Sequence, residues 1–338
     1  MKELVSIIIP AYQEEGRIGR CLKNILKSSY SKVELIVVND GSTDRTEEIV
    51  RAFMKKVNRR GWEIRLINIP NGGLAHARNT GLRYARGQYI GFMDADDLIH
   101  PRMIERLAES LSRGNDMSVC GLMICDESGK PSWKRWQYSM KGQRRKCPAA
   151  ALKMAMWEQI SMSSCRTLFR REKILDEKGE LKLYFPENVV SFEDFSFVCE
   201  YIYRCRGILE ILPFYGYYYC KRKGSLTSKR YSAAELRHAL QPIMEVGNRM
   251  GSSFHAHQIQ YTFRFLAYWC RETYRCSRRE FAPGTKNWDI CMQEMERYAG
   301  VYLLAPNVSL MKKLALLIAW KMPGLGWILV KVLGGVVL

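Results

Sequence analysis

The sequence predicts an α/β fold with a mostly parallel sheet flanked by helices, and two observations support this fold class. Short apolar runs rich in β-branched residues alternate with amphipathic segments over the first hundred of the 338 residues. Polar or glycine residues follow each apolar run directly. An alternation of strand and helix of this kind places successive strands in parallel, with helices on both faces of the sheet.

The strands are expected at residues 5–9, 33–39, 64–69 and 89–93. Helical spacing of apolar residues predicts helices at residues 16–28, around Ile49 to Phe53, and at residues 74–84. The carboxyl ends of these strands are followed by Tyr12 and Glu14, Asp40 and Asp44, Gly72 and Gly73, and Asp94 and Asp96. Because the carboxyl ends of parallel strands meet at one edge of a sheet, we expect a ligand crevice of nucleotide-binding type there.

The composition is that of an ordinary globular protein, with 47% apolar and 26% charged residues. The eleven cysteines are scattered and include no Cys-x-x-Cys pair. This pattern favours reduced thiols in a cytosolic protein over a disulfide or zinc framework. The first residues show no secretory-signal pattern, which favours the same location.

The net charge of +19 is concentrated in the second half of the chain. Residues 1–130 hold 20 Lys and Arg against 17 Asp and Glu, whereas residues 131–338 hold 33 against 17. Such a bias indicates an anionic partner, which could be a membrane surface, a phosphorylated substrate or a nucleic acid.

An acidic run, Asp94-Ala95-Asp96-Asp97, follows the fourth apolar strand. Two carboxylates two residues apart can turn toward one point, where they would hold Mg²⁺ or Mn²⁺ together with phosphate oxygens. The alternative is a solvated acidic turn that caps a helix starting near Pro101.

Four segments carry a resemblance to a known family: IIIPAYQEE (7–15), VVNDGSTDRT (37–46), NGGLAHARNTG (71–81) and GFMDADD (91–97). Together they resemble the inverting family 2 glycosyltransferases of the GT-A fold, densely over about 110 residues and more loosely to about residue 230. The resemblance implies a GT-A domain at 1–230, with a nucleotide-sugar half at 1–125 and an acceptor-side half at 126–230. A helical region would follow at 231–338.

The resemblance also implies a nucleotide-diphosphate sugar, with UDP expected, as donor. Asp40 would accept the imide N–H of uracil, Tyr12 would face the base, and Arg78 would pair with Asp40 or a phosphate. Asp96 would bind Mn²⁺ or Mg²⁺ directly, with Asp94 on the ribose or the metal. The full expected donor site is Pro10, Ala11, Tyr12, Glu14, Asp40, Gly73, Arg78, Asp94, Ala95, Arg222 and Ser225. His76 is expected to be a helix-surface residue, with a donor contact as the alternative.

The catalytic base that the resemblance implies is Asp194, with Glu193 orienting it. Its aromatic surroundings, Phe192 and Phe195, would partly desolvate the carboxyl and raise its pKa. The alternative is an N-cap pair for a helix at 195–203. The stretch Cys165-Arg166-Thr167 replaces the Trp-x-Lys of relatives, so the resemblance does not identify the acceptor.

Two basic segments have open interpretations. Residues 221–228 resemble a loop that folds over the donor pyrophosphate, with a solvated loop as the alternative. Residues 131–146 mix Trp with Arg and Lys. This segment would either stack on sugar rings or nucleobases or form a loop that packs its Trp side chains on the sheet.

The last residues, 310–338, are apolar and interrupted by Trp and Lys, with no uninterrupted run of eighteen uncharged residues. A spanning helix is therefore not expected, and an amphipathic helix on an anionic membrane surface is favoured. Docking on the domain or on a second copy of the chain is the alternative, so a homo-oligomer stays open. The expected location is cytoplasmic, peripheral on the inner face of the cell membrane.

The leading hypothesis is thus a metal-dependent inverting glycosyltransferase that acts on a glycan or lipid-linked acceptor in surface polysaccharide biosynthesis. A basic nucleic-acid-binding protein is the rival, but carboxylates at several strand ends argue against nucleic acid. A sugar nucleotidyltransferase would carry a glycine-rich phosphate loop with a lysine after the first strand, and residues 10–14 do not form one.

Overall fold

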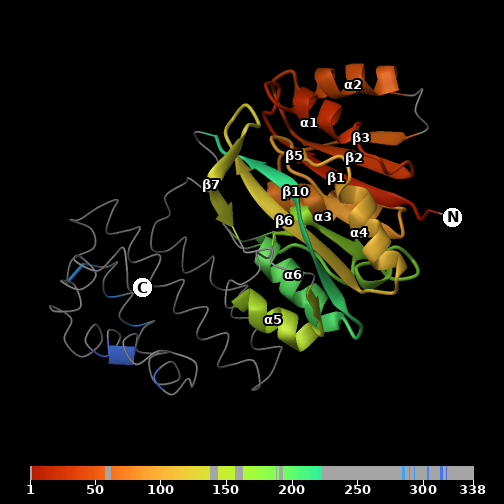
Figure 1. Cartoon of the computed structure of the whole chain (residues 1–338). Helices are drawn as coiled ribbons and strands as arrows, with labels where there is room; N and C mark the ends of the chain where they lie inside the picture. Colours follow the sequence, from red (N-terminus) through yellow and green to blue (C-terminus); the bar gives the residue numbers. More distant parts are fainter. Residues whose placement is uncertain are drawn as a thin grey trace. The chain divides into compact units, whose positions relative to one another are not determined.

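The computed structural model describes residues 2–57, 62–137, 144–156, 163–187, 189 and 193–222, and a few isolated residues beyond 283. The chain divides into two compact units, one of residues 1–155, 159–188 and 193–225, the other of residues 156–158, 189–192 and 226–338. The elements and the site described below belong to the first unit (Figure 1). Residue 230 lies outside the described residues, so the expected domain boundary there stays a prediction.

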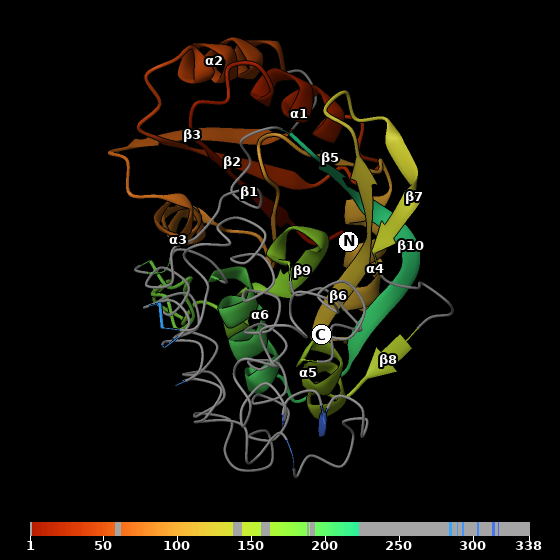
Figure 2. The ribbon, with the colours of Figure 1, turned by 90° about the vertical axis from the view of Figure 1, so that its left-hand side faces the viewer.

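A ten-stranded sheet forms the first unit (Figures 1 and 2). Its main order is β3-β2-β1-β4-β9-β6-β10-β5, with β7 paired to β6 and β8 paired to β10. The strands are β1 (Val5–Ala11), β2 (Val33–Asp40), β3 (Glu63–Ile69), β4 (Tyr89–Phe92), β5 (Leu98–Ile99), β6 (Met117–Cys125), β7 (Pro131–Gln137), β8 (Arg144–Lys146), β9 (Thr167–Arg170) and β10 (Leu209–Cys220).

The described helices lie between these strands. They are α1 (Ile18–Ile25), α2 (Thr46–Val57), α3 (Leu74–Tyr84), α4 (Met103–Ser112), α5 (Pro148–Met156) and α6 (Glu193–Arg204), with two short 3₁₀ helices, η1 (Ser164–Arg166) and η2 (Arg171–Lys173). The expected alternation of strands and helices over the first hundred residues is confirmed, with bounds that differ by a few residues.

The first four strands pair in parallel, as the alternation predicted. Strand β9 then lies antiparallel to both β4 and β6, so the sheet is mixed beyond β4. Because β9 runs antiparallel to β4, with Leu168 opposite Gly91 and Arg170 opposite Tyr89, the start of β9 lies beside the carboxyl end of β4, where the acidic run begins. The α/β class is therefore confirmed, and the expected mostly parallel sheet is parallel across β3-β2-β1-β4 and mixed beyond it.

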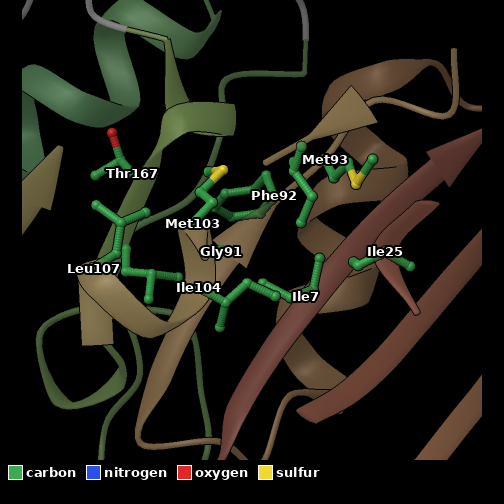
Figure 3. A pocket seen from close by; sticks show the side chains of 11 residues that line it. Ile7, Ile25, Gly91, Phe92, Met93, Met103, Ile104, Leu107 and Thr167 are labelled. Carbon is green, nitrogen blue, oxygen red and sulfur yellow. The ribbon is translucent and has the colours of Figure 1, made fainter. Parts of the chain in front are cut away.

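Helices cover both faces of the sheet. Ile8 on β1 is in register with Phe92 on β4, and Gly81 of α3 packs against Ile8 on that face. On the other face, Ile7, Ile25 of α1 and Leu107 of α4 line an apolar cavity (Figure 3). No charged side chain lines this cavity, so it is separate from the acidic edge of the sheet.

A cluster of aromatic rings fills the core on the α3 side. Phe92 of β4 makes edge contacts with Phe169, Phe185 and Phe197, at ring-centroid distances of 6.1, 5.1 and 5.8 Å. Phe185 and Phe197 stack at 4.0 Å. The cluster connects β4, β9, the segment before α6 and α6 itself, and it lies immediately beneath the acidic residues.

Two expectations about segments need correction. Pro10 was expected to close the first strand, but β1 continues to Ala11. Pro10 has no backbone N–H to donate to a neighbouring strand. Strand β4 pairs with β1 only as far as Ile8, so Pro10 costs no hydrogen bond on the β4 side of β1. For the segment at 131–146 two interpretations were left open, and the loop alternative is wrong, because the segment contains β7 and β8.

The hairpin leading into β7 explains the second correction. Asp126 accepts hydrogen bonds from the backbone N–H groups of Ser128 and Lys130 through one carboxylate oxygen, and Gly129 adopts a φ of 87°. This tight turn returns the chain along β6, so its backbone joins the sheet. The Trp side chains of this segment lie outside the described residues.

The tail at 310–338 also lies outside the described residues, apart from Lys313, Leu314 and Leu317, which are helical. Within the part of the chain that the structure describes, no helix has the length and apolar character needed to cross a membrane. The membrane-surface interpretation of the tail stays a prediction.

Replacing Gly81 by Ala tests the close approach of α3 to β1. An added Cβ would overlap the side chain of Ile8, so we expect the free energy of unfolding to fall by about 1–3 kcal/mol in urea titrations. In an open helix the same change would raise stability.

Gly19→Ala in α1 is the matched control, because its Cβ would meet Ile49 at an ordinary 3.5 Å. We expect that variant to be neutral or more stable by up to about 1 kcal/mol. If both variants changed stability equally, the close approach of α3 to β1 would be wrong.

Candidate active site

Glu14 is placed by the turn that follows β1. Gln13 adopts a positive φ of 54°, and its side-chain oxygen accepts hydrogen bonds from the backbone N–H groups of Thr43 and Asp44. The backbone N–H of Glu14 donates to the hydroxyl of Thr46 at 2.8 Å. These contacts join the turns after β1 and β2 and direct the buried Glu14 carboxylate inward. Burial raises the pKa of Glu14, against an opposing hydrogen bond from Arg17.

Asp40, at the end of β2, organises the turn between β3 and α3. Its two carboxylate oxygens accept the backbone N–H groups of Gly72 and Gly73 at 2.8 and 2.9 Å. Gly73 needs its φ of 86° to begin α3 in this geometry. Of the two partners expected for Arg78, Asp40 is wrong, because its carboxylate is held by the turn and Arg78 contacts other carboxylates. The phosphate alternative stays a prediction.

Arg78 is the centre of the site. It projects from α3 with 2% of its side chain exposed, and its guanidinium contacts three carboxylates. One nitrogen, Nη1, donates to Glu193 and Asp194 at 3.0 Å each, and the other, Nη2, donates to Asp94 at 3.0 Å. The guanidinium also lies 5.3 Å from the ring centre of Phe185. A single buried cation thus joins the end of β4 to the start of α6.

The carboxylate of Asp194 sits between Arg78 and the hydroxyl of Ser164, which donates to it at 2.7 Å. Burial raises the pKa of Asp194 to about 6, although the charge of Arg78 acts in the opposite direction. The sequence predicts a shift in the same direction. Helix α6 begins at Glu193, so Glu193 and Asp194 also occupy its first turn. Ser164 was missed, because nothing in its sequence surroundings marks it.

The three aspartates of the acidic run have different partners. Asp94 binds Arg78, and Asp96 binds Arg222 with an Nε–Oδ2 distance of 2.6 Å. Asp97 is buried and accepts hydrogen bonds from the hydroxyl of Tyr217 at 2.6 Å and from a backbone N–H of β10. Burial first, and then the charges of Asp94 and Asp96, raise the pKa of Asp97 well above its usual range. Asp97 is therefore part of the fold, while Asp94 and Asp96 stay partly exposed.

Arg222 lies two residues beyond β10 and contacts both Asp96 and Glu14, the latter at 3.1 Å. The sequence placed Arg222 among the donor-binding residues, and the structure brings it to the same edge of the sheet as the acidic run. Ser225 and the rest of the basic segment at 223–228 lie outside the described residues.

The remaining expected donor residues occupy the same edge. Pro10, Ala11 and Ala95 are buried, whereas Tyr12 has 51% of its surface exposed. His76, expected on the helix surface, is about one-third exposed and its Nδ1 lies 3.1 Å from a carboxylate oxygen of Glu187. The roles of the eleven expected donor-site residues stay predictions.

The carboxylate oxygens of Asp94 and Asp96 fit a hard divalent cation that is held jointly with phosphate oxygens. Among the described residues no cluster of three His, Cys, Asp or Glu forms a complete metal cage. Asp94 and Asp96 supply carboxylate oxygens close enough that, after burial, the charge of Asp94 raises the pKa of Asp96. Mg²⁺ and Mn²⁺ in nucleotide sites are commonly held by one or two carboxylates, with substrate phosphates completing the shell.

Comparison with known proteins places this geometry in a family. The model of the family described as "Glycosyl transferase family 2" matches residues 6–177. The uncharacterized glycosyltransferase EpsJ of Bacillus subtilis is 44% identical over 122 residues, which are 36% of this chain and 34% of EpsJ. The matching segment thus spans about a third of that relative.

Two solved structures share the fold at low sequence identity. Residues 1–349 of S. aureus TarS in complex with UDP-GlcNAc give a TM-score of 0.67 at 19% identity, covering 94% of this chain and 87% of that one. The mannosyltransferase PcManGT from Pyrobaculum calidifontis in complex with GDP-Man and Mn²⁺ gives 0.53 at 20% identity, covering 97% and 83%. The expected GT-A-type fold is confirmed. With a family model that matches half of its length, the chain belongs to glycosyl transferase family 2.

Proposed function

We propose that the chain is a metal-dependent inverting glycosyltransferase that moves a sugar from a UDP-sugar to a hydroxyl of a glycan or lipid-linked acceptor. The observation that supports it most is the contact of one buried guanidinium, Arg78, with Asp94 on one side and Asp194 on the other. This contact fixes a donor-side carboxylate and a candidate base at the same edge of the sheet.

The donor would lie along the carboxyl ends of β1, β2 and β4. Tyr12 offers an exposed ring to a nucleobase, and the Asp40 turn presents the start of α3 beside it. TarS was solved with UDP-GlcNAc and PcManGT with GDP-Man, which supports a nucleotide sugar as the class of donor.

Asp94 and Asp96 would hold Mn²⁺ or Mg²⁺ against the diphosphate. When bound, such a cation stabilises the negative charge that develops on the leaving diphosphate. The complex of PcManGT with Mn²⁺ supports this choice.

Asp194 would act as the base in a single displacement. Its carboxylate removes the proton from the acceptor hydroxyl as that oxygen forms a bond to the anomeric carbon, and the nucleoside diphosphate departs from the opposite face. The configuration is therefore inverted. Arg78 and Ser164 both bind the same oxygen of Asp194, Oδ1, so Oδ2 is the oxygen placed to receive the proton.

Donor turnover tests the proposal. The full chain, incubated with a panel of UDP-sugars and Mn²⁺, is expected to release UDP, and EDTA is expected to stop the release. Asp194→Asn should bind UDP with Mn²⁺ normally yet release at least about 100-fold less product. The variant should still fold, because the ionised form of this buried carboxyl is already disfavoured. Release from no UDP-sugar, or full turnover by Asp194→Asn, would count against the proposal.

The pH dependence of turnover follows from the pKa of Asp194. A base must be deprotonated to accept a proton. Burial raises the pKa of Asp194 to about 6, so its carboxyl is protonated below that pH and cannot act as a base there. At saturating donor and Mn²⁺ we expect kcat to be constant above about pH 7 and to fall about tenfold per pH unit well below 6. Circular dichroism at each pH would show that the fold persists. A kcat that stayed flat to pH 4.5 in the folded protein would remove Asp194 from the role.

The stability of the site depends on Arg78. Arg78→Gln leaves three carboxylates facing one another without their shared cation, so we expect the free energy of unfolding to fall by about 3 kcal/mol. Arg51→Gln is the control, because Arg51 forms an exposed pair with Glu47 and its loss should cost about 0.5 kcal/mol or less. Equal losses in urea titrations would contradict a central structural role for Arg78.

A further inference from the structure

Arg222 is a cation already bound at the acidic run. Its Nε lies 2.6 Å from Oδ2 of Asp96, and its Nη2 lies 3.1 Å from Oε1 of Glu14. The side chain is 25% exposed, while those of Asp96 and Glu14 are 18% and 7% exposed. A partly buried guanidinium therefore bridges the turn after β1 and the turn after β4.

The position of this guanidinium conflicts with that of a divalent cation. The proposed function uses the oxygens of Asp96 for the metal, and Arg222 holds one of them. A dication at Asp96 would also lie within a few ångströms of the guanidinium, where like charges repel. Metal and guanidinium therefore compete for the same carboxylate.

A diphosphate offers Arg222 a different partner. The guanidinium fork matches phosphate oxygens with two parallel hydrogen bonds, which is a stronger arrangement than its single Nε contact with Asp96. Arg222 follows the last strand of the sheet and is attached to the described site only through Glu14 and Asp96. A change of partner there exchanges these two hydrogen bonds for bonds to phosphate oxygens.

We propose that Arg222 acts as an internal counter-cation that occupies Asp96 in the absence of donor and leaves it for the donor diphosphate, so that metal and nucleotide bind cooperatively. This inference rests on the proposed function. Metal alone would bind weakly because it must displace Arg222. Nucleotide with metal would bind well because the same guanidinium then neutralises the phosphates.

The competing interpretation is a structural tie. On that view Arg222 only fastens the end of β10 to the turn after β1, and its removal would loosen the site and weaken Mn²⁺ binding. The two interpretations therefore predict opposite changes in the affinity for Mn²⁺ without nucleotide.

The test measures Mn²⁺ binding to the full chain by electron paramagnetic resonance of the free ion, first without nucleotide and then with UDP. For Arg222→Gln we expect Mn²⁺ alone to bind at least about fivefold more tightly than to the unmodified chain. UDP should enhance Mn²⁺ binding strongly in the unmodified chain and several-fold less in Arg222→Gln. Affinity for UDP in the presence of Mn²⁺ should fall in the same variant.

Arg17→Gln is the matched control. Arg17 is 26% exposed and contacts Glu14 at 2.6 Å, and Arg222 contacts the same carboxylate at 3.1 Å. Unlike Arg222, Arg17 forms no hydrogen bond or ion pair with Asp96 among the described residues. It removes the same charge from the same neighbourhood, so any tighter Mn²⁺ binding it causes measures the general effect of charge. If Arg222 is the counter-cation, Arg222→Gln must increase the affinity for Mn²⁺ more than Arg17→Gln does.

Asp96→Asn distinguishes a failure of the counter-cation role of Arg222 from a failure of the metal site itself. If it abolishes Mn²⁺ binding while Arg222→Gln binds Mn²⁺ no more tightly than Arg17→Gln, the counter-cation role is overturned and the metal site stands. If Mn²⁺ binding is absent from the unmodified chain and from Arg222→Gln, or is unaffected by Asp96→Asn, the metal site and the inference both fail.

Discussion

The contact between Arg78 and its three carboxylates is the interaction on which the rest of the site depends. A guanidinium with 2% of its side chain exposed requires nearby negative charge, since a buried unpaired charge is strongly destabilising. Asp94 comes from the end of β4, and Glu193 and Asp194 come from the start of α6. Satisfying one cation therefore brings together segments about a hundred residues apart. The aromatic cluster beneath, which includes Phe185 against the guanidinium, excludes water from the same place.

The three aspartates of the acidic run differ in their partners. Asp97 fastens β10 through Tyr217 and is inaccessible to a ligand. Asp94 contacts the buried guanidinium of Arg78, and Asp96 contacts the partly buried guanidinium of Arg222. Asp97 thus serves the fold, whereas the roles proposed for Asp94 and Asp96 are in the contact between donor site and base and in metal binding. The partner of each residue, and not its place in the motif, decides which role it has.

The sequence predicted the strands and helices of the first hundred residues well, because apolar periodicity reports directly which face of an element is buried. It also predicted that Asp94, Arg78, Asp194 and Arg222 belong to one site. Of the two partners expected for Arg78, Asp40 was wrong, because two of the three carboxylates that bind Arg78 are 115 and 116 positions away and periodicity says nothing about distant pairing. The antiparallel insertion of β9 beside β4 and the hydroxyl of Ser164 on Asp194 were missed for the same reason.

The central claim is that the acidic end of β4 and the acidic start of α6 form one site through Arg78. A crystal structure of the full chain with UDP and Mn²⁺, with anomalous diffraction to locate the metal, tests it most directly. We expect the manganese peak at Asp96 beside the diphosphate, with Arg78 still bound to both Asp94 and Asp194. A manganese peak and a diphosphate remote from Asp96, or an Arg78 side chain turned away from Asp194, would contradict it.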